Sequence, residues 1–325
     1  MRVHASFLIG DSEYSAFTIR TLAAFKGVRT NLEKPLVLWL TDLHLDRSSD
    51  TRKIGFYEEI RASTASVIVI TGDISVARHL PLHLAELAAA ASPRKVFFTL
   101  GNHDFFGSSI AKVEGVVAGV CRSQVNLQHL GHGEIIRLNS DTALVGHRGW
   151  GDGRMGWGAR TFARNPDFAA IADFRGLSRG ESFALLRKLG QESATYLRSV
   201  LPYALSCFEH VVVATHVPTF TQAAFYRRKP CDNLRQPFYS NLSAGGVILR
   251  IAQRFPKSKV TVLAGHTHCA AQFQALPNLA LRVGGARPGF PGAQGLFEVS
   301  AAGLAQKSGS PVSRCSNRGG TQPPA

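Results

Sequence analysis

The chain has 325 residues, of which 45% are hydrophobic and 18% are charged, so it can bury the core of one large domain or two small ones. No apolar run reaches the roughly 18 residues of a membrane-spanning helix, and Met1–Gly10 lacks the sustained apolar stretch of a secretory signal. The net charge of +15 is compatible with an anionic substrate or with nucleic acid, and composition excludes only a transmembrane protein.

The cysteines are odd in number and widely spaced, and no C-x-x-C occurs. They are Cys121, Cys207, Cys231, Cys269 and Cys315. Such a pattern indicates reduced thiols rather than a disulfide framework. Reduced thiols and the lack of a secretory signal together predict a cytoplasmic protein.

Apolar runs rich in β-branched or aromatic residues predict strands along most of the chain. In order they are Leu36–Leu40, Val67–Thr71, Val96–Leu100, Thr142–Val145, Val211–Thr215, Val260–Ala264, Leu279–Val283 and Leu296–Val299. Most are continuously apolar, which is typical of strands covered on both faces.

Helical patterns lie between these runs. Leu80–Ala91 is rich in Leu and Ala, and Pro81 falls in its first turn, where a missing N–H is tolerated. Glu181–Leu205 carries apolar residues at helical spacing, and Ser178 with Glu181 fits a capping box. Alternating strands and helices predict an α/β protein.

The predicted core domain covers residues 34–300, with peripheral stretches around and within it. Residues 1–33 are expected to form an N-terminal extension that is partly disordered. Gly149–Gly180 is a long excursion rich in Gly and Arg, of the kind that is functional or disordered. From Ala301 onward, a composition of Ser, Gly, Pro and Gln predicts a disordered tail over residues 301–325.

Short polar motifs follow five of the predicted strands. They are Asp42-Leu43-His44, Gly72-Asp73, Gly101-Asn102-His103-Asp104, Thr215-His216 and Gly265-His266-Thr267-His268. Alternate residues of an extended chain point the same way, so Asp42 and His44 can reach one ion. Mixed nitrogen and oxygen ligands suit Mn, Fe, Zn or Ni better than Ca. The ordered set therefore predicts two divalent metal ions at the strand ends. The remaining histidines, such as His147 and His210, are expected to be ordinary surface or internally satisfied side chains.

This set of motifs resembles the calcineurin-like metallophosphoesterase superfamily, whose pattern is D-x-H, G-D, G-N-H-D/E, H and G-H-x-H. The match covers roughly residues 34–285. The resemblance implies a four-layer α/β/β/α sandwich with a binuclear metal site at the strand ends.

The resemblance also implies a role for each matched position. One metal ion would be bound by Asp42, His44, Asp73 and His268. The other would be bound by Asp73, Asn102, His216 and His266, so that Asp73 bridges the two ions. His103 would lie beside the ions as a proton donor to the leaving oxygen, or as a stabiliser of transition-state charge.

The chain departs from the family pattern at one position. Many members read G-D-x-x-D, whereas Val76 stands where the second Asp would be. In relatives that distal carboxylate can orient the catalytic histidine. The task of orienting His103 must therefore fall to another group, for which Asp104 is the candidate, or go undone.

The expected reaction follows from paired cations. Two ions about 3.5–4 Å apart lower the pKa of a bridging water and neutralise charge on phosphoryl oxygens. We therefore expect hydrolysis of phosphoric esters by metal-activated hydroxide. A small phosphodiester or nucleotide-like compound is the favoured substrate, because the domain is compact and no nuclease capping domain is evident. A nuclease, a phosphomonoesterase and a non-catalytic metal-binding scaffold are the alternatives.

Two basic segments are candidates for contact with the substrate. One contains Arg148 and Arg154, and the other contains Arg227 and Arg228. Arginine binds phosphate in a bidentate manner, and Trp150 and Trp157 could offer flat surfaces to a base. The alternative is that these arginines only solvate a long loop. Nucleic acid is not favoured as a partner, because the basic residues are scattered and few aromatic residues alternate with them.

Overall fold

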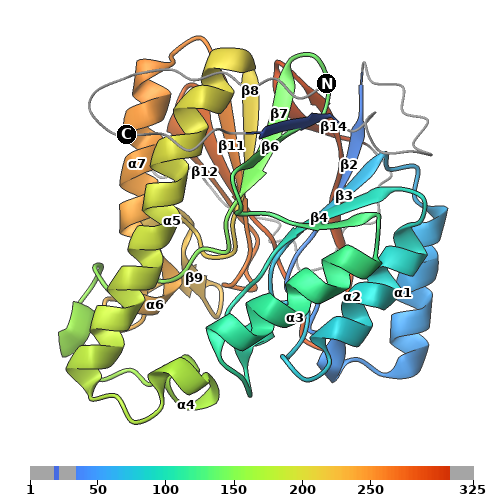
Figure 1. The fold of residues 1–325 in the computed structure, drawn as a ribbon. Helices are drawn as coiled ribbons and strands as arrows, with labels where there is room; N and C mark the ends of the chain where they lie inside the picture. Colours follow the sequence, from blue (N-terminus) through green and yellow to red (C-terminus); the bar gives the residue numbers. More distant parts are fainter. Residues whose placement is uncertain (1–17, 22–33, 308–325) are drawn as a thin grey trace.

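Two mixed β-sheets lie face to face in the computed structural model, which describes residues 18–21 and 34–307 (Figure 1). Helices cover the outer side of each sheet, so the layers run helix, sheet, sheet, helix. This arrangement confirms the α/β class that the sequence patterns predict and the four-layer α/β/β/α sandwich that the family resemblance implies.

The first sheet has the strand order β15-β14-β2-β3-β4-β5. The strands are β2 Leu36–Leu40, β3 Val67–Thr71, β4 Lys95–Thr99, β5 Leu127–His129, β14 Ala293–Ser300 and β15 Gly303–Gln306. Strands β2 to β5 run parallel, whereas β14 runs antiparallel to β2 and β15 antiparallel to β14. The parallel strands bring the chain segments that follow them to one edge of the sheet.

The second sheet has the strand order β1-β6-β7-β8-β11-β13-β12. The strands are β1 Thr18–Thr21, β6 Glu134–Arg137, β7 Thr142–Gly146, β8 His210–Ala214, β11 Lys259–Ala264, β12 Ala271–Leu276 and β13 Leu279–Val283. Its central strands β7, β8, β11 and β13 are parallel. A separate hairpin pairs β9 Phe225–Tyr226 with β10 Lys229–Pro230.

Five helices of three turns or more form the outer layers of the described chain. They are α1 Asp50–Ala62, α2 Leu80–Ala91 and α3 Ile110–Ser123 on the first sheet, and α5 Arg179–Cys207 and α7 Leu242–Arg254 on the second. Shorter helices are α4 Asp167–Ala170 and α6 Gln236–Tyr239, with 3₁₀ turns at Leu45–Arg47, His103–Phe105, Gly158–Arg160, Ala172–Phe174 and Thr221–Ala223. None of the helices in the described part is long and apolar enough to cross a membrane.

Three apolar clusters hold the layers together. The cluster between the sheets includes Val37, Trp39, Val69, Phe97, Leu144, Val212 and Leu263. Alternate residues of the same strands face outward: Leu38 packs beneath α1 to α3, whereas Val211 and Val213 pack beneath α5 and α7. Because each central strand is buried on both faces, its sequence reads as a continuous apolar run.

All the predicted strands form, with ends that shift by at most three residues. Helix Leu80–Ala91 forms at its predicted bounds, and the predicted capping box of Ser178 and Glu181 starts α5. Sequence patterns missed α1, α3 and α7. In α1, nearly half of the residues are charged, and the helix buries only Phe56, Tyr57 and Ile60. They also missed the short strands β5 and β6, which are too brief to show a period.

The C-terminal part of the described chain differs from the expected disorder after Ala301. Gly303–Gln306 forms β15, which pairs with β14. Gly303 has a φ of 115°, which permits the tight turn between these two strands. The rest of the predicted tail, and most of the predicted extension over residues 1–33, lie outside the described residues. Within that extension, β1 pairs with β6.

The excursion Gly149–Gly180 is folded against the rest of the protein. Trp150 is buried and lies 5.6 Å from Phe105 and 6.4 Å from Phe174 between ring centroids. Trp150 therefore packs in the core and cannot offer a flat surface to a base, whereas Trp157 is 45% exposed.

Candidate metal centre

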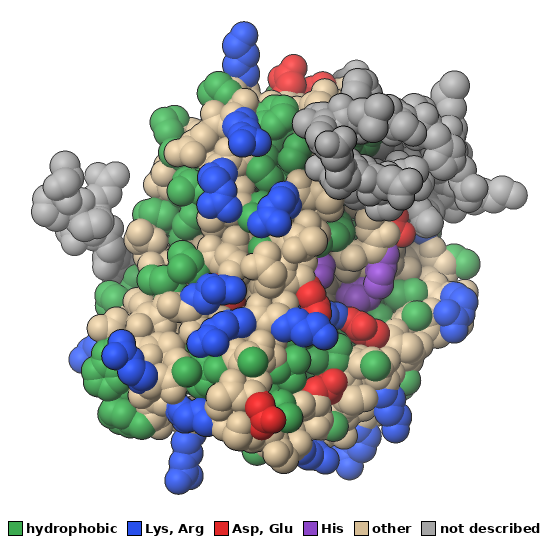
Figure 2. Space-filling view, turned by 60° about the vertical axis from the view of Figure 1, so that its left-hand side comes forward, with side chains coloured by type: hydrophobic (Ala, Val, Ile, Leu, Met, Phe, Trp, Pro, Cys, Tyr) green, Lys and Arg blue, Asp and Glu red, His purple; other side chains and the backbone are tan. Residues whose placement is uncertain are grey.

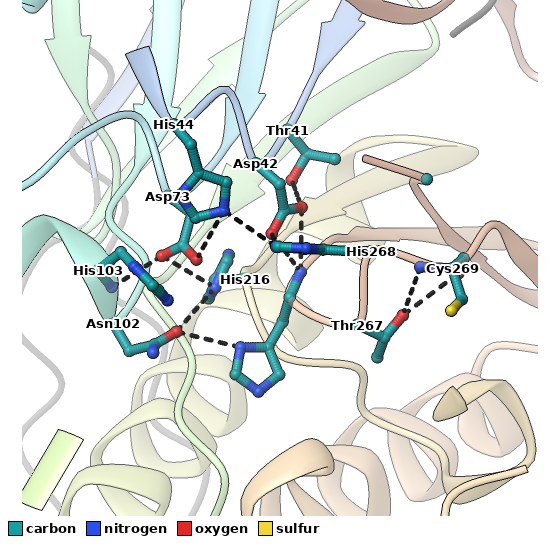
Figure 3. A network of polar contacts seen from close by, with 12 residues as sticks. Thr41, Asp42, His44, Asp73, Asn102, His103, His216, Thr267, His268 and Cys269 are labelled. Carbon is teal, nitrogen blue, oxygen red and sulfur yellow. Dashed lines mark hydrogen bonds and ion pairs between the residues drawn. The ribbon is translucent and has the colours of Figure 1, made fainter. Parts of the chain in front are cut away.

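Every predicted metal ligand lies just beyond the carboxyl end of a strand, at the edge where the two sheets meet (Figure 3). Asp42, His44, Asp73 and Asn102 come from the first sheet, and His216, His266 and His268 come from the second. Backbone hydrogen bonds join the loops, since the N–H of His44 donates to the carbonyl of Asp73 at 3.0 Å. Figure 2 shows histidine side chains reaching the surface beside acidic and basic groups.

The first set of side chains is Asp42, His44, Asp73 and His268, whose ligand atoms all lie within 4.8 Å of one another. Nε2 of His44 lies 2.9 Å from Nε2 of His268 and 3.7 Å from Oδ2 of Asp73. Oδ1 of Asp42 lies 3.4 Å from Nε2 of His268. Two carboxylates and two imidazoles that converge in this way could hold a divalent metal ion.

The second set shares Asp73 with the first. Oδ1 of Asp73 lies 3.2 Å from Nε2 of His216. Oδ1 of Asn102 lies 3.2 Å from the same nitrogen and 3.1 Å from Nδ1 of His266. Asp73 therefore turns one oxygen toward each set.

Backbone carbonyls determine which nitrogen of two histidines faces the second set. Nδ1 of His216 lies 2.8 Å from the carbonyl oxygen of Thr71, and Nε2 of His266 lies 3.1 Å from that of Phe238. A carbonyl only accepts, so these nitrogens carry the proton and the opposite nitrogens present lone pairs. Those lone pairs face oxygens of Asp73 and Asn102. Converging acceptors require a cation, and the donor set fits a divalent metal ion.

Asp167, which the sequence did not predict as a site residue, sets the orientation of the Asn102 amide. Nδ2 of Asn102 donates to Oδ1 of Asp167 at 2.8 Å, and Asn165 donates to the other carboxylate oxygen at 3.2 Å. The carboxylate accepts, so the amide oxygen turns toward the histidines. Asp167 begins α4 within the excursion Gly149–Gly180. No local motif marks it, and the length of the excursion was the only signal.

The pKa values of the buried groups also indicate that a positive charge is stabilised at this site. Burial alone would raise the pKa of Asp73, but the charges of His216 and His103 hold it well below its usual range. Burial alone would lower the pKa of His216, but the carboxylate of Asp73 raises it to about 10. Either a proton or a metal ion can supply the positive charge that balances the carboxylate of Asp73. Burial lowers the pKa of His44 and His266 to about 3, which keeps both rings in the neutral form that binds metals.

Five of the seven candidate ligands have a left-handed backbone. The φ angles are 49° at Asp42, 42° at His44, 52° at Asp73, 71° at His266 and 56° at His268. Among the other described non-glycine residues, only Arg227 and Arg228 have a positive φ. Such conformations cost about 1–3 kcal/mol each and cluster at functional sites. The strain is therefore concentrated where the candidate ligands meet.

Two glycines of the motifs are required by close contact with the carboxylates. A Cβ at Gly101 would lie 2.2 Å from Oδ1 of Asp73, and a Cβ at Gly265 would lie 2.2 Å from Oδ2 of Asp42. Both distances are far below van der Waals contact, so any side chain at these positions would displace a ligand.

His103 lies at the rim of the centre. Its ring stacks on Phe106 with centroids 4.2 Å apart and meets the ring of His44 edge-on at 4.7 Å. The predicted orienting group, Asp104, is turned away from His103, because its two oxygens accept from the N–H groups of Ser75 and Gly101 at 2.8 Å. Nδ1 of His103 instead lies 3.5 Å from Nη2 of Arg47.

The predicted substrate arginines lie in different surroundings. Arg148 is paired with Glu114 and, at 2.8 Å, with Glu192, so its guanidinium is already engaged. Arg154 lies 3.6 Å from the buried carboxylate of Asp152. Arg227 and Arg228 are exposed at the turn of the β9–β10 hairpin, with φ angles of 49° and 65°.

Ring contacts link this hairpin to the metal centre. The ring of Tyr226 lies 5.8 Å from that of Tyr239, which in turn lies 5.0 Å from the ring of His266. The guanidinium of Arg227 lies 5.3 Å from the ring of Tyr226. The hairpin thus reaches a candidate ligand through aromatic rings. The segment of Arg148 reaches one through its backbone, since the N–H of His216 donates to the carbonyl of Arg148 at 3.0 Å.

Comparison with known proteins agrees with this fold. A dimetal phosphatase from Danio rerio has 12% sequence identity and a TM-score of 0.53, over 82% of this chain and 93% of that chain. The protein TT1561 of Thermus thermophilus has 11% identity and a TM-score of 0.49, over 84% of this chain and 98% of that chain. At 12% identity, the likeness to the Danio rerio protein bears on the fold alone.

Comparison with curated proteins finds no matching sequence. The sequence pattern of the calcineurin-like phosphoesterases, in contrast, matches residues 35–270. This match spans most of the chain and includes every motif that contributes to the centre. The chain therefore belongs to the calcineurin-like phosphoesterase family.

Proposed function

We propose that this protein is a binuclear-metal-dependent phosphoesterase that prefers a small phosphodiester or nucleotide-like substrate. The observation that supports it best is the placement of Asp73, whose Oδ2 lies 3.7 Å from His44 and whose Oδ1 lies 3.2 Å from His216. A carboxylate shared in this way suits two neighbouring cations. The donors suit Mn, Fe, Zn or Ni, two ions per chain.

Bound metal ions would neutralise charge on the phosphoryl oxygens and lower the pKa of a nearby water. The proton for the leaving oxygen would come from His103. A neutral imidazole that gave up its single ring proton would become an imidazolate, so His103 would act as the imidazolium, which can release the proton on Nε2 and end as a neutral ring. Phe106 and His44 hold the ring at the rim, which suits a general acid.

Two observations favour a small diester over a long polynucleotide. The described strands all belong to the two sheets except the β9–β10 hairpin, so no additional sheet forms a platform for nucleic acid. Arg227 and Arg228 are exposed on that hairpin and can contact a second substituent of the phosphate.

Metal analysis combined with two synthetic substrates tests the proposal. Protein reconstituted with Mn, Fe or Zn should approach about two ions per chain, and should hydrolyse bis(p-nitrophenyl) phosphate with a higher kcat/KM than p-nitrophenyl phosphate. Turnover of the monoester alone would make the protein a phosphomonoesterase. Bound metal without hydrolysis of either substrate would favour a non-catalytic metal-binding scaffold.

Replacing Arg227 tests the substrate contact. Arg227→Ala should raise KM for the diester by about two- to fivefold, the usual effect of an exposed charge contact, with a smaller effect on the monoester. Arg122→Ala, which removes an exposed arginine from the end of α3, is the matched control. Equal KM values for wild type and variant would show that the hairpin does not contact the substrate. Tight, salt-dependent binding of long DNA would favour a nuclease.

A further inference from the structure

A second group of arginines, which sequence analysis did not single out, lies on the His103 side of the metal centre. Arg47 lies 3.5 Å from Nδ1 of His103. Arg287 follows Ala286, whose N–H donates to the carbonyl of His268 at 3.2 Å. The group is completed by Arg52, in the first turn of α1. These three residues, Arg47, Arg52 and Arg287, are called the rim arginines below.

Phe290 holds two of the rim arginines on one aromatic ring. The guanidinium carbon of Arg52 lies 3.8 Å from the ring centroid, and that of Arg287 lies 4.0 Å from it. Two cations at these distances from one ring repel each other, and the attraction to the ring offsets only part of that cost. Phe290 is 41% exposed, so the paired guanidinium groups face solvent.

Backbone contacts connect this pair to Arg47. Nη1 of Arg52 donates to the carbonyl of Gly289 at 3.3 Å. Gly289 packs so closely on the carbonyl of Arg47 that a Cβ would lie 3.0 Å from its oxygen. With a φ of 82°, Gly289 also occupies a conformation that suits glycine. The three arginines therefore belong to one locally packed structure at the rim.

Among the described residues, the rim arginines take part in a single ion pair. Arg47 lies 3.9 Å from Asp46, and no ion pair found among the described residues includes Arg52 or Arg287. All three are exposed. Three positive charges with one carboxylate partner among them attract an anion, and guanidinium groups bind phosphate through two parallel hydrogen bonds.

We propose that the rim arginines form a binding site for a second phosphate group of the substrate, carried by the part of the molecule that leaves from the His103 side. This inference rests on the proposed function, because it places the scissile phosphate at the metal centre. It adds the substrate class: a phosphoester whose ester substituent itself bears a phosphate. The site differs from the β9–β10 hairpin, which is linked to His266 through the ring of Tyr239.

Diphosphonates test the site without turnover, because their C–P bonds are not cleaved by ester hydrolysis. Calorimetry would measure the affinity of the metal-reconstituted wild-type protein for butylphosphonate. The same measurement would be made with α,ω-alkylene diphosphonates of two to six methylene groups. At the best-fitting length, the second phosphonate should tighten binding at least about fivefold, and added salt should reduce this gain. The double variant Arg52→Gln/Arg287→Gln should lose the gain.

Two further variants make the result specific. Arg122→Gln removes a distant exposed arginine and should keep the gain. Phe290→Leu keeps both charges but removes the aromatic ring, and should lose part of the gain. Equal binding of monophosphonate and diphosphonate by wild type, or a double variant that keeps the preference, would overturn the inference.

Parallel assays separate this inference from the proposed function. Wild type should hydrolyse bis(p-nitrophenyl) phosphate whether or not the rim arginines bind a second phosphate. Turnover without a diphosphonate preference would overturn the rim site alone. A diphosphonate preference without turnover of any phosphoester would overturn the proposed function and leave the anion site standing.

Discussion

Strand β8 has a buried histidine near each end, and the two histidines have opposite surroundings. His210 is the first residue of the strand, and His216 lies two residues beyond its end. Nδ1 of His210 lies 2.9 Å from the carbonyl oxygen of Ser300, and its Nε2 lies 2.9 Å from the hydroxyl of Thr261. A neutral ring satisfies both contacts, one as donor and one as acceptor. His216 satisfies only Nδ1 in this way, and its Nε2 faces oxygens of Asp73 and Asn102.

The pKa values differ in the same sense. Burial lowers the pKa of His210 to about 4. The carboxylate of Asp73 outweighs burial at His216 and raises its pKa to about 10. Burial of a histidine therefore does not by itself mark a functional site. A functional site is indicated by a buried histidine nitrogen that faces only hydrogen-bond acceptors, because this arrangement is stable only with a bound cation.

The largest expected effect comes from the residue that both sets of ligands share. Asp73→Asn removes a charge from each set, so metal content should fall from about two ions per chain to less than one, with loss of turnover. Asp42→Asn, which belongs to one set only, should leave more metal bound. Elemental analysis after gel filtration measures both. Equal metal loss in the two variants would contradict a shared carboxylate.

His103→Ala should separate catalysis from metal binding. We expect metal content to stay at the wild-type level while kcat falls by roughly 10²–10⁴-fold, the usual contribution of a general acid. The fall in kcat should be larger for substrates with poor leaving groups than for p-nitrophenyl esters, because their hydrolysis depends more on protonation of the leaving oxygen. A parallel fall in bound metal would place His103 among the ligands instead.

Asp167→Ala should affect only the second set. Without the carboxylate, the amide of Asn102 can rotate, and the affinity for one of the two ions should fall by about 10–100-fold. Asp173→Ala is the matched control, since Asp173 lies in the same excursion and accepts from the N–H of Ile110. Titration with metal should show one weakened and one unchanged step for Asp167→Ala. Two unchanged steps would show that Asp167 does not position the amide.

The smallest effect on turnover is expected at His210, where a substitution should change the pH dependence of stability. Below the ordinary histidine pKa the unfolded chain binds a proton there, whereas the folded chain stays neutral until about pH 4. Wild type should therefore lose stability between about pH 6.5 and pH 4, on the order of 3 kcal/mol from this group.

His210→Phe should show a shallower loss over the same range, whatever its stability at pH 7. Urea unfolding at several pH values measures the two slopes. Identical slopes would show that His210 titrates normally in the folded protein.

The fold and the candidate ligands could be read from local sequence patterns, whereas the supporting groups could not. Buried strands are continuous apolar runs, and the motifs at their ends keep fixed spacing, so Asp42, His44 and His268 were identifiable. Asp167 and the rim arginines act through contacts between segments distant in sequence. Asn102 and Asp167, for example, are 65 residues apart. Packing alone shows that Trp150 is buried and that Arg148 is engaged by two carboxylates.

Anomalous diffraction from crystals of the manganese-reconstituted protein tests the central claim most directly. The account predicts two peaks about 3.5–4 Å apart. One should lie among Asp42, His44, Asp73 and His268, and the other among Asp73, Asn102, His216 and His266. A single peak, or a peak that Asp73 does not contact, would contradict a binuclear centre built around this shared carboxylate.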